Sequence, residues 1–159
     1  MWWLVSPQNP LKTTADMAPI GTRVAAAAVV ARHRRIDVTD LELRLGTRFT
    51  IDTVAALLQR YPKVRFVWLM GADNLVDFDH WSRWRALARL VPIAVFARPG
   101  YVGQARTAPA MAWFRRFRPA SSARRWREWR LPAIVVFDIR MSLLSATAIR
   151  AADPGWATR

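Results

Sequence analysis

Three short segments of the 159-residue sequence carry residue types that suit anion and nucleotide binding. The segment SPQNPLK ends in the cation Lys12. The segment GADNLVDFDHW offers Gly71, which lets a ligand approach the backbone closely, the carboxylate of Asp73 and the indole of Trp81. The segment LSATAIR ends in the guanidinium of Arg150. These groups could bind a phosphate, a ribose hydroxyl and a flat heteroaromatic ring.

Each segment also has an ordinary structural interpretation. Ser145 or Thr147 could cap a helix whose free N–H groups, together with Arg150, bind an anion. The same residues also fit a routine capped helix with one surface arginine, and we favour that interpretation for so short a motif taken alone. Asp73 could accept hydrogen bonds from ribose hydroxyls, or it could cap the helix that follows. Trp81 could stack on a ligand ring or pack in the core, which is the commoner fate of a tryptophan.

The elements that must position these segments alternate between strands and helices. Apolar runs predict five strands, and helical patterns predict three helices. The strands are 2–6, 36–38, 64–70, 92–97 and 133–139, and the helices are 18–33, 50–61 and 145–152. This alternation predicts an α/β fold with a parallel sheet, in which ligands bind at the carboxyl ends of strands. The chemistry should therefore lie in the turns after Val5, Met70 and Phe96.

The chain opens on a segment that is typical of a buried strand. Trp2 to Val5 form an apolar run that ends at Ser6-Pro7, as in the interior of a parallel sheet. Domains more often begin with a few loose polar residues. The opening therefore suggests that the domain begins upstream of the sequence given.

Composition limits the class of protein. The length is that of one domain, and a hydrophobic fraction of 53% indicates a globular chain. The absence of cysteine excludes disulfides and thiolate metal sites, and two histidines argue against a histidine-rich metal centre. The net charge of +14 could indicate an anionic partner, but we favour a compositional bias because nearly all of it is arginine. No apolar run reaches membrane-spanning length, so we expect a cytoplasmic protein without a membrane partner.

The order of the motifs resembles nicotinate-nucleotide adenylyltransferase. WWLVSPQNPLK, RFT, FVWLMGADNLVDFDHW, PIAVFARPGY and LSATAIR follow one another from Trp2 to about Arg150. The resemblance implies a Rossmann-like nucleotidyltransferase with helices on both faces of its sheet, as a single domain over residues 1–159. It also implies transfer of the AMP part of ATP to nicotinate mononucleotide, with Mg²⁺ present and pyrophosphate released.

The resemblance assigns three residues to the nicotinate mononucleotide. Lys12 would lie near the substrate phosphate, Thr50 would meet the nicotinate group, and Trp81 would pack on the pyridine ring. Phe49 stands where relatives commonly have tyrosine, which removes a hydroxyl.

The resemblance assigns four further residues to ATP. Gly71 and Asp73 match a turn that faces the adenosine, whereas Ser145 and Arg150 match the segment that grips the phosphates.

One central motif of the family is not among these residues. The motif GGSFDPxHxGH, whose histidines bind ATP phosphates, should lie upstream of WWLVSP, where only Met1 is present. Its strand would be central in the sheet, so two strands here would lack a neighbour. His33 and His80 belong to other segments, so we assign no catalytic residue. We expect either a start codon taken at an internal methionine or a truncated protein, and in both cases a 159-residue chain with little or no activity.

Two alternatives stay open at this point. Pantetheine-phosphate adenylyltransferase shares the phosphate motifs, although GADN, FDHW and ARPGY favour the nicotinate enzyme. The arginine- and tryptophan-rich stretch 111–130 could bind nucleic acid, with salt-sensitive affinity. We favour an amphipathic helix whose aromatic residues face the core. The sequence does not indicate the oligomeric state.

Overall fold

The computed structural model describes residues 1–7, 18–117 and 128–139. The described residues divide into two compact units, the first within Met1–Phe49 and the second within Thr50–Leu143. The single domain over residues 1–159 stays a prediction. The predicted helix at 145–152 lies outside the described residues.

The first unit contains a short parallel sheet and two helices. Strand β1 (Trp2–Leu4) pairs with β2 (Asp37–Thr39), and Trp3 lies opposite Val38. Helix α1 spans Ile20–Val30 and α2 spans Leu41–Leu45. These elements confirm the predicted strands at 2–6 and 36–38 and the helix at 18–33. Helix α2 was not predicted, because five residues are too few to show a helical period.

The prediction that the opening strand is buried is wrong. Trp2 and Trp3 are 42% and 39% exposed, and within this run only Val5, at 8%, is buried. Among the described residues β1 has one neighbouring strand, β2, so it is an edge strand. A sheet of two short strands covers little apolar surface, which leaves both indoles partly in water.

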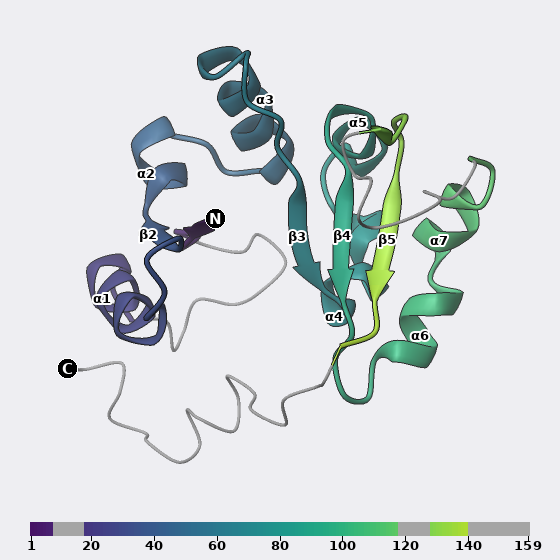
Figure 1. Ribbon diagram of the computed structural model, residues 1–159, viewed down its shortest axis with the longest axis horizontal. Helices are drawn as coiled ribbons and strands as arrows, with labels where there is room; N and C mark the ends of the chain where they lie inside the picture. Colours follow the sequence, from purple (N-terminus) through teal and green to yellow (C-terminus); the bar gives the residue numbers. More distant parts are fainter. Residues whose placement is uncertain (8–17, 118–127, 140–159) are drawn as a thin grey trace. The chain divides into compact units, whose positions relative to one another are not determined.

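The second unit is built on a three-stranded parallel sheet in the order β3-β4-β5 (Figure 1). The strands are β3 (Trp68–Gly71), β4 (Ile93–Phe96) and β5 (Ile134–Phe137). The central strand β4 is buried at its first three residues, as expected for a strand whose two faces are both covered. These strands confirm the predicted α/β fold with a parallel sheet. Strand β3 is an edge of this sheet among the described residues.

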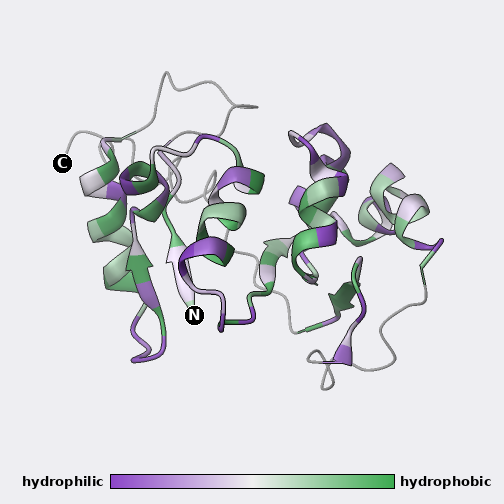
Figure 2. Cartoon of the chain, turned by 90° about the horizontal axis from the view of Figure 1, so that it is seen from above, coloured by the Kyte–Doolittle hydropathy of each residue, from purple (hydrophilic) through white to green (hydrophobic). Residues whose placement is uncertain are grey.

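One helix precedes β3, and further helices follow β3 and β4. They are α3 (Thr50–Arg60), α4 (Ala72–Val76), the 3₁₀ helix η1 (Phe78–His80), α5 (Trp84–Leu90), α6 (Val102–Thr107) and α7 (Pro109–Phe114). Figure 2 shows hydrophobic and hydrophilic bands alternating along the helices, as amphipathic packing requires. Helix α3 confirms the predicted helix at 50–61.

Helix α7 begins the arginine- and tryptophan-rich stretch. Trp113 and Phe114 are buried, whereas Arg115 and Arg116 are exposed. The described part of the stretch is therefore arranged as the amphipathic interpretation expects.

Aromatic rings fill the core beneath α5 and α7. Trp84 lies edge-to-face with Phe78 at 5.6 Å and with Trp113 at 5.0 Å between ring centroids. Trp113 in turn contacts Phe114 and Phe117, at 5.0 and 4.8 Å. These contacts join η1, α5 and α7 into one packed cluster. None of the described helices combines the length and apolar character that a membrane crossing needs.

Two leucines on α5 provide a matched test of this core. Leu87 is 1% exposed and Leu90 is 36% exposed. We expect Leu87→Ala to lower the free energy of unfolding by about 2–5 kcal/mol, because it leaves a cavity among buried side chains. Leu90→Ala should lower it by less than about 1 kcal/mol. Urea unfolding followed by tryptophan fluorescence measures both, and equal losses would contradict the assigned packing.

Candidate functional site

The carboxyl ends of β3 and β4 hold an ion pair. Gly71, the last residue of β3, lies opposite Phe96, the last residue of β4. Asp73 follows in the first turn of α4, and Arg98 follows β4. Nη1 of Arg98 donates a hydrogen bond to Oδ2 of Asp73 at 2.5 Å. The pair thus bridges two neighbouring strand ends, where parallel sheets bind ligands.

The other carboxylate oxygen of Asp73 is available as an acceptor. Oδ1 is buried and has no hydrogen-bond partner among the described residues. The side chain does not cap α4, because the cap residue is Gly71 and no side-chain cap bond forms there. One oxygen is therefore held by Arg98, and the other can accept a hydrogen bond from a ligand hydroxyl or from water.

Gly71 leaves space that the Asp73 side chain occupies. Its backbone is extended, with φ −79° and ψ 160°, so any residue could adopt it. A Cβ at this position would however clash with Oδ1 of Asp73. The missing side chain at Gly71 is what allows the carboxylate to lie against the end of β3.

Trp81 is half-buried and packs against other aromatic rings. Its ring lies edge-to-face with Phe78 at 5.4 Å and with Trp68 at 6.4 Å. The backbone at Trp81 is extended, which ends η1. Contacts with the core therefore cover part of the indole surface. The part that stays exposed could pack against the ring of a ligand.

Two buried polar atoms lie on residues close to Trp81. Nε1 of Trp68, whose ring touches Trp81, has no hydrogen-bond partner among the described residues. The same holds for Oδ1 of Asp79, which precedes Trp81 by two positions. Buried donors and acceptors are nearly always satisfied in folded proteins. Both atoms therefore keep unused hydrogen-bonding capacity among the described residues.

A second ion pair joins the first turn of α3, which begins at Thr50, to the Trp81 loop, residues 81–83. Thr50 is the first residue of α3 and is half-buried, and Asp52 lies in the same turn. Arg83, just before α5, donates through Nη2 to Oδ1 of Asp52. Helices α3 and α5 pack against each other, so residues far apart in sequence meet here.

Arg23 links two parts of the first unit. It donates to the carbonyl oxygens of Ser6 at 2.6 Å, Pro7 at 2.9 Å and Ala18 at 3.0 Å. Burial lowers the pKa of the Arg23 guanidinium from its ordinary value. These carbonyls are at the described ends of the segment 8–17, which contains Lys12. Nothing in the sequence separates Arg23 from the other arginines, so sequence reasoning missed it.

The described residues include only part of the predicted site. Lys12, Ser145 and Arg150 lie outside them. Gly71 and Asp73 are in contact at the carboxyl end of β3.

Thr50 and Trp81 are linked through the Asp52–Arg83 ion pair. Trp68, which Trp81 contacts, is the first residue of β3, so this second group is attached at the opposite end of the strand from Gly71.

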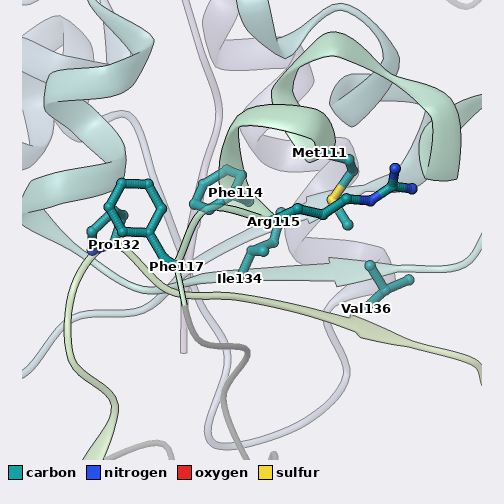
Figure 3. A pocket seen from close by; sticks show the side chains of 7 residues that line it. All are labelled: Met111, Phe114, Arg115, Phe117, Pro132, Ile134 and Val136. Atoms are coloured by element: carbon teal, nitrogen blue, oxygen red, sulfur yellow. The ribbon is translucent and has the colours of Figure 1, made fainter.

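An apolar pocket of about 300 Å³ lies apart from these groups (Figure 3). Residues of α7, of the turn after it and of β5 line it, and Arg115 is the charged member. None of the predicted site residues belongs to its lining. Among the described residues, no group of three potential metal-ligating side chains is present.

Comparison with known proteins identifies the family. Residues 1–152 match the model of the cytidylyltransferase-like family. A probable nicotinate-nucleotide adenylyltransferase from Erythrobacter litoralis is 50% identical over 160 residues, covering 100% of this chain and 73% of the relative. The homologue from Parvibaculum lavamentivorans is also 50% identical, covering 100% of this chain and 79% of its own. A third, from Cereibacter sphaeroides, is 52% identical over 151 residues, covering 95% and 80%.

A solved structure supports the fold. Plasmodium falciparum nicotinic acid mononucleotide adenylyltransferase, complexed with APC, superposes with a TM-score of 0.63 at 13% identity. The alignment covers 94% of this chain and 66% of that one, just under two thirds of its length. This likeness confirms the predicted Rossmann-like architecture. With the matches over nearly the whole chain, the protein belongs to the nicotinate-nucleotide adenylyltransferase family of cytidylyltransferase-like nucleotidyltransferases.

Proposed function

We propose that the protein acts in the transfer of the adenylyl group of ATP to nicotinate mononucleotide, a step of NAD biosynthesis. The observation that carries the proposal is the Asp73 carboxylate, held by Arg98 at 2.5 Å beside Gly71 and with Oδ1 unpartnered among the described residues. A fixed acceptor at the end of a parallel strand suits the ribose hydroxyls of a nucleotide. The names of the relatives supply the substrate.

The chemistry needs positioning more than reactive side chains. A phosphate oxygen of nicotinate mononucleotide attacks the α-phosphorus of ATP, and the bond from that phosphorus to the bridging oxygen of pyrophosphate breaks. The attacking group is already an anion, so no protein nucleophile or strong base is required. The protein must hold two anions in line and neutralise the charge that develops on the leaving group.

The proposed roles divide between the two substrates. Oδ1 of Asp73 accepts a hydrogen bond from the ribose of ATP, and Gly71 leaves room for that carboxylate. Thr50 meets the nicotinate group and Trp81 packs on the pyridine ring. Three residues outside the described ranges complete the proposal: Lys12 near the phosphate of nicotinate mononucleotide, and Ser145 and Arg150 on the phosphates of ATP.

Mg²⁺ would come with ATP. The described residues contain no group of three carboxylate or histidine side chains that could hold a metal ion. Triphosphate oxygens are the ligands that Mg²⁺ prefers in such enzymes. We further propose that the reaction takes place in the cytoplasm.

Trp81 tests the nicotinate end of the site. We expect Trp81→Ala to weaken binding of nicotinate mononucleotide about tenfold or more, because stacking on an aromatic ring is lost. Binding of ATP should change less than about twofold. Isothermal titration calorimetry measures both, with Trp3→Ala as the control that removes a partly exposed tryptophan of the first unit. Phosphopantetheine should not bind the parent chain, and a preference for it would refute the nicotinate assignment.

Gly71 tests the adenosine end. We expect Gly71→Ala to displace the Asp73 carboxylate and to weaken ATP binding about tenfold, as loss of a hydrogen bond to a charged group would. Gly103→Ala is the matched control, because a Cβ there has nothing within 4 Å. Both variants are titrated with ATP and with nicotinate mononucleotide. Unchanged ATP affinity in Gly71→Ala would contradict the role of Asp73.

A third experiment concerns turnover. Neither His33 nor His80 lies in a HxGH motif, so we propose that a polypeptide of these 159 residues alone forms deamido-NAD slowly or not at all. An extended polypeptide that carries a GGSFDPxHxGH segment before Trp2 should release pyrophosphate at least about a hundredfold faster. The reason is that the histidines of this motif would bind the phosphates of ATP and stabilise the charge that develops during the reaction. Comparable rates from the two polypeptides would disprove this proposal.

A further inference from the structure

Arg83 has a backbone conformation that is unusual for an arginine. Its φ is +49° and its ψ is 37°, in the left-handed region, and it is the one non-glycine residue with positive φ among those described. Side chains with a Cβ adopt this region at a cost that glycine avoids. A long charged side chain is therefore retained where a glycine would fit the backbone better.

The side chain of Arg83 is directed to α3. Its guanidinium donates to Asp52, and the two side chains are 60% and 40% exposed. Ion pairs as exposed as this contribute little to stability. The stability of the pair therefore does not by itself account for an arginine in the left-handed region.

The nearest basic residue along the chain, Arg85, is engaged elsewhere. Its guanidinium lies over the ring of Trp84, 4.6 Å from the centroid. Among the described residues, Arg83 is thus the cation that pairs with Asp52.

The spacing shows what the pair connects. Asp52 follows Thr50 by two positions, and Arg83 follows Trp81 by two positions. At its other end the Trp81 loop is held by ring contacts with Phe78 and Trp68. The short stretch 81–83 is thus fixed at both ends, once by aromatic packing and once by charge.

We propose that Asp52 and Arg83 form a positioning pair that sets the separation of Thr50 from Trp81, and so sets the affinity for the pyridine end of nicotinate mononucleotide. The inference rests on the proposed function of these two residues. Neither Asp52 nor Arg83 touches the substrate in this account. Both act by holding the start of α3 against the loop that carries the indole.

The first test is a set of variants titrated with nicotinate mononucleotide and, separately, with ATP. Asp52→Asn and Arg83→Gly each remove the pair, and Arg83→Gly also relieves the backbone conformation. Both should raise the Kd for nicotinate mononucleotide about five- to tenfold and leave the Kd for ATP within about twofold, in the range of an indirect coupling. The double variant Asp52→Arg with Arg83→Asp exchanges the two charges. It should reverse at least half of the increase in the logarithm of the Kd for nicotinate mononucleotide.

A control variant separates this effect from the general loss of an ion pair. Asp40→Asn breaks the Asp40–Arg44 pair, 2.9 Å long and also exposed, on α2 of the first unit. It should leave both dissociation constants unchanged. The proposal is overturned if the pair variants bind nicotinate mononucleotide as the parent does, or if both ligands weaken equally.

A second readout does not depend on the substrate. The indole N–H signal of Trp81 in a ¹H–¹⁵N NMR spectrum is assigned by its loss in Trp81→Phe. Asp52→Asn should shift this signal in the ligand-free protein, whereas Asp40→Asn should not. If the parent chain does not bind nicotinate mononucleotide, the proposed function is wrong, but this measurement still tests the positioning role of the Asp52–Arg83 pair. An unshifted signal in Asp52→Asn would overturn that role.

Discussion

The parallel ladder between β3 and β4 is the constraint on which the candidate site depends. Its register sets Gly71 beside Phe96, and so brings the residues after each strand to the same edge of the sheet. Asp73 and Arg98, 25 positions apart, meet there because their strands end together. A shift of register by one residue would move Phe96 away from Gly71, and so would separate the residues that follow the two strands.

Three arginines connect segments that are far apart in the sequence, each through a different kind of contact. Arg98 holds one oxygen of Asp73, Arg83 joins the Trp81 loop to α3, and Arg23 bonds to three backbone carbonyls. The planar guanidinium has five donors and keeps its charge, which suits all three tasks. The net charge of +14 is therefore a poor guide to binding partners, because it also counts arginines that form specific contacts within the protein.

Local sequence patterns predicted the larger elements well. The strands of the second unit are apolar runs with clear ends, and α3 has a regular apolar face that Pro62 follows. Helices α2 and α6 were not predicted, because five or six residues do not complete two turns and show no period. The burial of Trp2 and Trp3 was predicted wrongly, since burial depends on what covers a strand and not on the strand's own residues.

The sequence by itself determined the class of fold, the family and the residue types that can bind a nucleotide. Motif order carries that information, because each motif is a continuous run of residues. The tertiary structure decided which side chains act in pairs: Asp73 with Arg98, and Asp52 with Arg83. Such partners lie 25 and 31 positions apart, and only the packing of strands and helices brings them together. A contact across that distance leaves no periodicity in the chain, so a single sequence does not reveal it.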